Sequence, residues 1–260
     1  PLQGISVQEW LTHTVRHPNV RQLLLALLRL STYTNDPDRQ SAGAALAQLQ
    51  LALSRGVVYI DGGWQTLVDG LRHAAQHAGV HLETSRKVTT IAHQTSVHGV
   101  TLDDGTHLQT HGVIMTGSPT EAVALVQGHA RTLLQQWAAT AVPVRAACLD
   151  VGLSRLPRPR ARFALGIDHP FYLSVHSAVA RLAPADSAVI HVAKYLPSTP
   201  TSEAKADEHE LEGVLDLMQP GWREVLVTRR FLPHLTVAHA LVSATGGGIA
   251  SRPGPTVPGV

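Results

Sequence analysis

Cysteine is almost absent from this 260-residue sequence, and aromatic residues make up only 4% of it. The single Cys148 excludes an internal disulfide and any CxxC pair for redox chemistry or metal binding. This cysteine usage favours a reducing compartment, so we expect a cytoplasmic protein. Because free cysteine is usually buried, Cys148, in the apolar stretch 144–151, is expected to be a core residue.

Charged residues and long apolar runs are also scarce. Charged residues form 15% of the chain, 21 Lys and Arg nearly balance 19 Asp and Glu, and no dense basic run is interleaved with aromatics. This pattern argues against a nucleic-acid partner. The longest aliphatic run, residues 23–28, is far too short to cross a bilayer, and no signal peptide is visible. Sparse charge indicates an apolar ligand or buried surface, and it leaves peripheral contact with a membrane open.

Histidine is abundant, with 16 residues, but its spacing does not predict a metal site. The pairs His13/His17 and His73/His77 have helical spacing, yet neither has a carboxylate or a third histidine at a recognised distance. We therefore expect no metal. The segment 117–119 lacks the Gly-x-Ser-x-Gly elbow of serine nucleophiles, and the sequence identifies no catalytic residue.

The first 55 residues carry helix signals. A capping-box pattern at Ser6 starts one helix, Pro18 suits the first turn of a second that ends near Tyr33, and Ser41 caps a third that Gly56 stops.

From residue 57 the pattern alternates between β-type runs and helices. Strand-like runs cover residues 57–60, 80–83, 87–93, 97–102, 106–109 and 113–116, with a helix up to residue 77. Helices follow up to about residue 137, then strands at 145–151, 162–166, 171–176 and 189–195 and a helix at 203–218. No crossover helix separates the later strands, which predicts antiparallel pairing among them.

Several motifs stand in an order that is hard to obtain by chance. Residues 56–71 (GVVYIDGGWQTLVDGL) resemble the strand, Gly-Gly, helix element of phytoene desaturase-like and amine oxidase-like flavoproteins. The segments GVHLET (79–84), VTTI (88–91), GVTLDDG (99–105) and VIMTGSP (113–119) follow at the expected intervals. Residues 211–224, 236–240, 246–248 and 252–253 resemble the approach to the C-terminal flavin segment of the same superfamily.

The sequence is thus identified as an internal piece of an FAD-dependent oxidoreductase of the phytoene desaturase and flavin-containing amine oxidase superfamily. Two family features are missing: the N-terminal Gly-x-Gly-x-x-Gly turn that receives the FAD pyrophosphate, and the C-terminal Gly-Asp segment. Gly246-x-Gly248 is no substitute, because Pro253 and Pro255 follow it instead of a helix. Both ends look like cuts, and we expect the chain as given to be inactive.

The resemblance implies FAD as the cofactor and assigns positions to it. Val88 matches the strand beside the adenine end, and the cofactor-binding positions as a group are Val88, Thr116, Gly117, Gly62 and Gly63. Tyr59 is expected to line the substrate pocket. Without the resemblance, Gly62 and Gly63 would only supply positive φ in a tight loop, Thr116 and Gly117 a strand-to-helix turn, and Tyr59 a half-buried strand aromatic.

The expected fold class is α/β, or mixed α+β: a partial FAD/NAD(P)-binding sheet domain interleaved with a substrate domain of antiparallel sheet and helices. Residues 1–55 and 120–235 would lie on the substrate side, and residues 56–119 and 236–260 on the cofactor side. The implied activity is phytoene desaturase-like removal of hydride from a hydrophobic, polyene-type substrate, as in carotenoid biosynthesis. Two alternatives stay open: a flavin amine oxidase branch, and a non-catalytic lipid- or partner-binding module. The oligomeric state is not predicted.

Overall fold

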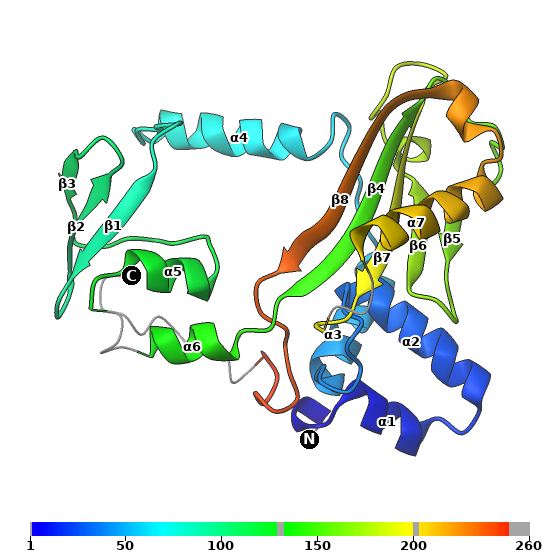
Figure 1. Ribbon diagram of the computed structural model, residues 1–260, viewed down its shortest axis with the longest axis horizontal. Helices are drawn as coiled ribbons and strands as arrows, with labels where there is room; N and C mark the ends of the chain where they lie inside the picture. The colour runs from blue at the N-terminus through cyan, green and yellow to red at the C-terminus, as the bar shows by residue number, and fades with distance from the viewer. Residues whose placement is uncertain (1, 129–132, 200–202, 250–260) are drawn as a thin grey trace. The chain divides into compact units, whose positions relative to one another are not determined.

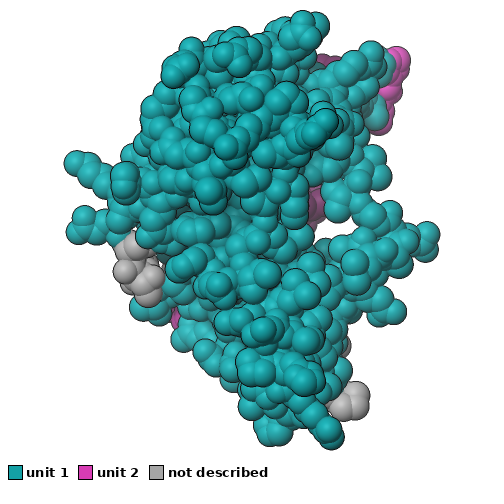
Figure 2. All heavy atoms as spheres, turned by 90° about the vertical axis from the view of Figure 1, so that its right-hand side faces the viewer, with its two compact units in different colours: residues 1–74, 143–250 teal, residues 75–142, 251–260 magenta. Residues whose placement is uncertain are grey.

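The computed structural model describes residues 2–128, 133–199 and 203–249 (Figure 1). The chain divides into two compact units, coloured in Figure 2: unit 1 contains residues 1–74 and 143–250, and unit 2 contains residues 75–142. The mixed α/β class is confirmed. The units change at residues 74/75 and 142/143, whereas the expected segments changed at 55/56 and 119/120. The assignment of these segments to a cofactor side and a substrate side stays a prediction.

Three helices begin unit 1, where the sequence predicted them: α1 (Val7–Thr14), α2 (Pro18–Thr32) and α3 (Ala42–Arg55), after a 3-10 turn at Leu2–Gly4. Ser6 Oγ accepts a hydrogen bond from Glu9 N, and Ser41 Oγ accepts one from Ala44 N, so both predicted N-caps are confirmed. Tyr33 ends α2 in the left-handed conformation, with φ of 59°. The three helices bury a small core made of Val7, Leu11, Leu28, Ala42 and Ala45.

A five-stranded sheet forms the rest of unit 1. Its strands are β4 (Val144–Leu153), β5 (Phe163–Leu165), β6 (Phe171–Val175), β7 (Ala188–Leu196) and β8 (Leu226–Ala238), in the order β5-β6-β7-β4-β8. Every neighbouring pair is antiparallel, which confirms the pairing that the sequence predicts.

The 13-residue β8 is a strand that the sequence analysis missed. Pro233 and the neighbouring Arg229 and Arg230 interrupt the alternation that marks a strand. The register with β4 jumps between Cys148↔Leu232 and Ala146↔Leu235, so Pro233 lies in a bulge. Proline is tolerated there because β8 is an edge strand, where a missing N–H need not break a central ladder.

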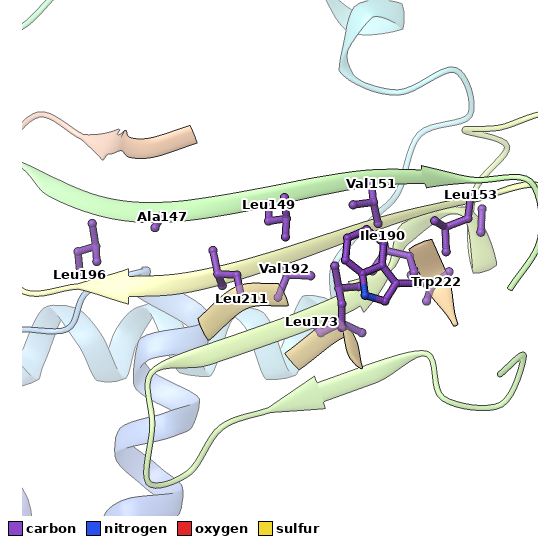
Figure 3. Packing of buried hydrophobic residues seen from close by; sticks show 13 residues of the cluster. Ala147, Leu149, Val151, Leu153, Leu173, Ile190, Val192, Leu196, Leu211 and Trp222 are labelled. Atoms are coloured by element: carbon purple, nitrogen blue, oxygen red, sulfur yellow. The ribbon is translucent and has the colours of Figure 1, made fainter. Parts of the chain in front are cut away.

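One face of this sheet is covered by α7 (Ala204–Met218) (Figures 1 and 3). Alternate side chains of β4 and β7 point to it and form the main core, together with Leu211 and Leu215 of α7 and the indole of Trp222 from the 3-10 turn Trp222–Val225. Because strand side chains alternate, the intervening residues of β4, β6, β7 and β8 point to the other face. We call that second face, which points away from α7, the distal face.

Unit 2 holds a three-stranded antiparallel sheet, β1 (Val88–His93), β2 (Val97–Leu102) and β3 (His107–Gln109), in that order. The helices α5 (Pro119–Leu125) and α6 (Leu134–Thr140) contribute to its core, which contains Ile91, Val97, Ala122, Val126 and Leu134. The helix α4 (Trp64–His77) precedes the sheet in the chain, and Gly79 follows it with φ of 82°. No helix in the described part of the chain is long and apolar enough to span a membrane.

Three strands that the sequence predicted do not form: residues 57–60, 80–83 and 113–116 belong to no described strand. Their apolar side chains are largely exposed, with Val58 84% and Ile114 95% accessible. A β-type run becomes a strand only where another strand satisfies its backbone N–H and C=O groups. Among the described residues none of the three runs has such a partner, so local propensity is not realised.

Candidate functional site

A row of polar side chains crosses the distal face of the five-stranded sheet. The cross-strand register places Ser174 of β6 opposite His191 of β7, His191 opposite Asp150 of β4, and Asp150 opposite Arg230 of β8. Arg229, one residue earlier, points the other way and pairs with Glu208 and Glu212 on α7, which leaves Arg230 on the distal face. We call these four residues the polar row.

The centre of the polar row is a hydrogen-bonded pair of side chains, His191 and Asp150. His191 Nδ1 lies 2.5 Å from Asp150 Oδ1, and the two side chains are 35% and 30% exposed. Because an ionised carboxylate can only accept hydrogen bonds, the proton of this bond belongs to His191 Nδ1. In the neutral ring Nε2 then carries the free lone pair, so Asp150 fixes the tautomer of His191.

A second imidazole lies against the first. The rings of His176 and His191 are 4.2 Å apart between centroids, and Tyr172 Oη lies 3.3 Å from His176 Nε2. Burial, assisted by the nearby His191, lowers the pKa of His176 to about 4, with Asp150 acting weakly in the opposite direction. His176 is therefore neutral at physiological pH, whatever the charge on His191.

The tyrosines of the chain gather around these groups. There are four in the sequence, and Tyr33 packs edge-on against Tyr195, Tyr59 against His176, and Tyr172 against Phe163. Burial raises the pKa of Tyr172 to about 12, so its phenol stays protonated. Tyr59, which the sequence analysis expected to line a substrate pocket, thus packs against His176, and its contact with a substrate stays a prediction.

An apolar row lies directly beside the polar row on the distal face. One residue from each strand contributes to it, in register across the sheet: Leu165, Tyr172, Ala193, Cys148 and Leu232. All five are partly buried, so Cys148 is not the fully buried core residue that the sequence suggested. Burial, followed by the charge of Asp150, raises the pKa of the Cys148 thiol to about 11.

The loop with Gly62 and Gly63 is tied to the segment that follows His176. Gly62 N donates to the Arg181 carbonyl at 3.0 Å, and Asp61 accepts from both the backbone N and the side chain of Arg181. These hydrogen bonds, the backbone one first, lower the pKa of Asp61. A cavity of about 390 Å³ lies here, lined by Asp61 and residues 177–187. That volume falls within the range of small-molecule pockets.

Both glycines of the loop are required by its own geometry. Their φ angles are 78° at Gly62 and 76° at Gly63, which side chains rarely tolerate. A Cβ at Gly62 would also lie 2.7 Å from Thr66 Oγ1, whereas a Cβ at Gly63 would meet only Leu182, at 3.5 Å. The positive φ that the sequence predicted is confirmed, and the approach of a cofactor to this loop stays a prediction.

The other expected cofactor positions, Val88, Thr116 and Gly117, belong to unit 2, whereas Tyr59, Gly62 and Gly63 belong to unit 1. Val88 begins β1, which is an edge strand of its sheet. Further along this edge Gln127 N donates to the Ile91 carbonyl. Among the described residues no such bond reaches Val88, and its contact with the adenine end of FAD stays a prediction.

The turn at Thr116 and Gly117, expected to pass near the ADP end of FAD, forms part of a helix cap. It leads into α5, whose N-terminus is closed by its own capping box: Glu121 Oε2 accepts from Ser118 N at 2.6 Å, and Ser118 Oγ accepts from Glu121 N. A Cβ at Gly117 would lie 2.6 Å from Glu121 Oε2, so glycine is needed for the cap itself. The first N–H groups of α5 are thus engaged by residues of the chain itself, and the approach of FAD to Thr116 and Gly117 stays a prediction.

Asp150, His191, His176 and Arg230 were missed by sequence reasoning. Asp150 and His191 each stand between two apolar neighbours in their strands, which is the one local signal they give. Alternation alone places such residues on the face opposite the core, but only the register of β4 with β7 brings the two together. That register depends on contacts between segments about 40 residues apart, which a single sequence does not display.

The family model for flavin-containing amine oxidoreductases matches residues 1–146, more than half of the chain. The match includes the three N-terminal helices and the series of motifs from residue 56 on. None of the curated proteins matches the sequence.

Several solved structures share the fold. An oxidoreductase from Methanosarcina mazei is 15% identical, with a TM-score of 0.72, and the match covers 92% of this chain and 58% of that one. The PF1083 protein from Pyrococcus furiosus is 18% identical, with a TM-score of 0.66 and coverage of 88% and 57%. A putrescine oxidase bound to putrescine is 13% identical, with a TM-score of 0.63 and coverage of 88% and 54%. The chain therefore spans little more than half the length of these structures, and likenesses at such identity establish the fold alone.

Proposed function

The chain belongs to the flavin-containing amine oxidoreductase family, and we propose that the complete protein is an FAD-dependent oxidoreductase that removes hydride from a hydrophobic substrate lying on the distal face. The observation that carries the proposal is the apolar row, Leu165, Tyr172, Ala193, Cys148 and Leu232, next to the gathered tyrosines. Tyrosines offer apolar contact area in few rotamers, which suits an elongated apolar ligand.

Membership of the family implies which part of the reaction the cofactor performs and which part the described residues perform. A bound flavin supplies the oxidation, as acceptor of the hydride. The described residues contribute the apolar surface that holds the substrate and excludes water from it. They also hold substrate carbon atoms beside the polar row, so that one end of the reacting bond meets a group able to exchange protons.

The choice of substrate class depends on the charges in the polar row. An amine substrate would present an ammonium group, and Asp150 is the carboxylate on the distal face that could receive it, which keeps the amine oxidase branch as the second candidate. Asp150, however, is already bonded to His191 and has Arg230 opposite it in the register. An ammonium there would meet a fixed positive charge, so a neutral hydrocarbon of the phytoene desaturase type is the better fit.

A substrate of that kind partitions into bilayers, and peripheral contact of the complete protein with a membrane is part of the proposal. The rival is a binding module without oxidation, which would use the same apolar row. The two differ in one measurable property: only the enzyme transfers electrons from substrate to flavin.

The test is anaerobic mixing of the complete flavin-loaded protein with a polyene in detergent micelles, or with a diamine, while the flavin absorbance is followed. We expect bleaching with the polyene. Bleaching by the diamine alone would replace the proposal by the amine branch. No bleaching by either, with the polyene still bound, would support the binding module.

A matched pair of variants tests the position of the substrate. Ala193→Phe fills the middle of the apolar row and should raise the KM for the polyene at least tenfold. Leu217→Phe adds the same ring to α7, on the other side of the sheet, where Leu217 is 73% exposed, and should change nothing. Equal effects of the two variants would remove the distal face as the substrate site.

A further inference from the structure

We propose that His191, oriented by Asp150, is the general base of the reaction and takes a proton from the carbon next to the one that loses hydride. The proposal rests on the proposed function. Loss of hydride from one C–H bond removes two electrons from the substrate, which a bound flavin would accept. The neighbouring carbon then releases its proton to His191 Nε2, and the electron pair of that C–H bond forms the new C=C bond. The substrate has then lost one hydride and one proton, so the atoms, electrons and charges of the step balance.

The geometry of the pair suits a base. Asp150 Oδ1 accepts from His191 Nδ1 at 2.5 Å, which keeps the lone pair on Nε2 and stabilises the imidazolium once the proton has arrived. No further hydrogen bond to the His191 ring is found among the described residues, and 35% of the side chain is accessible. A ligand can therefore approach the ring.

The position of the pair also agrees with this role. His191 precedes Ala193 by two residues on β7, and Asp150 follows Cys148 by two on β4, so both lie on the distal face one row from the apolar row. Side chains two residues apart on one face are neighbours about 7 Å apart. A hydrocarbon lying on Ala193 and Cys148 thus places carbon atoms within reach of the ring.

The groups that face His191 can be compared as candidates for the base. Asp150 and Arg230 lie along the row on one side and Ser174 on the other. Tyr172 belongs to β6 itself, His176 to the turn that follows β6, and Tyr59 to the segment before α4. The phenol of Tyr172 stays protonated, and His176 lacks a carboxylate partner and stays neutral because it is partly buried. His191 alone among them combines a lone pair with a carboxylate that compensates the acquired charge.

A structural ion pair is the competing interpretation. No group of three or more His, Cys, Asp or Glu side chains in the described residues is arranged to hold a metal ion, so a metal does not explain the cluster. A purely structural pair would make stability, not chemistry, depend on His191. The two interpretations therefore differ in which measurement responds to substitution.

The experiment uses the complete protein with His191→Gln, Asp150→Asn and, as control, His209→Gln on the exposed side of α7. The rate of flavin reduction at saturating polyene is measured anaerobically from pH 5 to 9. We expect the wild-type rate to rise with pH through one ionisation, and His191→Gln to be 10²–10⁴-fold slower and independent of pH, with KM unchanged. His209→Gln should behave like the wild type.

A second readout does not depend on turnover. In the substrate-free protein, the protonated ring nitrogen of His191 is identified by ¹⁵N NMR, and Asp150→Asn should lower the share of the Nδ1–H tautomer, which the Asp150 carboxylate favours. An unchanged tautomer in Asp150→Asn, or a His191→Gln rate within threefold of wild type, overturns the assignment of the base while leaving the proposed function intact. A wild-type protein whose flavin no hydrophobic substrate reduces overturns the proposed function and this inference together.

Discussion

Lys194 Nζ lies 2.7 Å from Asp207 Oδ1, and this pair ties β7 to α7 across the core of the sheet, with the Asp207 side chain only 1% exposed. A second carboxylate, Glu210 of α7, lies 2.6 Å from the same nitrogen but is 44% exposed. Burial by itself lowers the pKa of Lys194, and the hydrogen bonds to Asp207 and Glu210 outweigh it, so the pKa is raised. The two carboxylates that bind Lys194 thus differ greatly in burial: Asp207 is buried and Glu210 is exposed.

Loss of the ammonium should therefore be much more costly than loss of the exposed carboxylate. Lys194→Met keeps the apolar stem but leaves the buried Asp207 carboxylate without its cation, and we expect a loss of about 3–5 kcal/mol in the free energy of unfolding. Glu210→Gln should cost no more than about 1 kcal/mol. Urea unfolding measures both, and similar losses in the two variants would contradict this account.

The stability of unit 1 should fall in mild acid because of His176. Its pKa is about 4 in the folded protein and near 6.5 when unfolded, so the unfolded chain binds the extra proton first. Stability is therefore fully present above about pH 6.5 and is lost as the pH falls towards 4. The full difference corresponds to at most about 3.4 kcal/mol, and we expect about half of that because the ring is only partly buried.

The measurement is thermal unfolding at pH 7.5, 6 and 5 for the wild type and His176→Gln. The variant should lose less stability between pH 7.5 and 5 than the wild type does. His98→Gln, which changes an exposed histidine of unit 2, is the control and should keep the wild-type slope. A slope unchanged in His176→Gln would show that other groups cause the acid sensitivity.

Three glycines with positive φ offer a graded test of local geometry. Gly56, Gly62 and Gly63 have φ of 71°, 78° and 76°, so alanine should cost about 1 kcal/mol or somewhat more at each. Gly62→Ala should cost the most, because its Cβ would press on Thr66 Oγ1 and disturb the bond from that hydroxyl to the Asp61 carbonyl. Chemical denaturation measures the free energy of unfolding of each variant. An equal loss at all three positions would mean that the Thr66 side chain moves aside at little cost.

Gly63→Val extends this test to the proposed function. Space is available at Gly63, since its Cβ would only touch Leu182 at 3.5 Å. If the loop faces the reacting groups, the variant should slow flavin reduction in the complete protein far more than it lowers the melting temperature. Normal turnover per folded molecule would make Gly63 a purely structural residue.

Cys148 should react slowly with alkylating reagents. Its pKa is about 11, so at pH 7.5 the reactive thiolate is a far smaller fraction than in a free cysteine, and we expect iodoacetamide to react at least tenfold more slowly than with glutathione. Burial is the main cause and Asp150 the lesser one, so Asp150→Asn should accelerate the reaction only modestly. Mass spectrometry of the labelled protein follows both rates.

Local signals were sufficient for much of the fold. Ser6 and Ser41 cap helices through hydrogen bonds with backbone groups three residues away, and such short-range rules can be read from the sequence. The same rules over-predicted strands at residues 57–60 and 113–116, because propensity does not reveal whether a partner strand is present. They also missed β8, because Pro233 interrupts the alternation that marks a strand.

The candidate site was predicted less completely, for a physical reason. Gly62, Gly63 and Tyr59 belong to a continuous motif and could be singled out from spacing and resemblance. Asp150 and His191 are separate in sequence, and their 2.5 Å contact depends on the register of two strands. A shift of one residue in that register would turn one of them to the opposite face, so nothing short of the folded sheet reveals the pair.

The position of Pro233 has a consequence for how the protein behaves at high concentration. β8 is a long edge strand with mostly exposed side chains, and such edges can template the addition of strands from other molecules. Pro233 removes a donor from the middle of that edge, and the bulge around it breaks the straight line of backbone groups that a second chain would need. Arg230 adds a positive charge that two such edges would bring together. The feature that hides the strand in the sequence thus also protects the folded protein against fibrous aggregation.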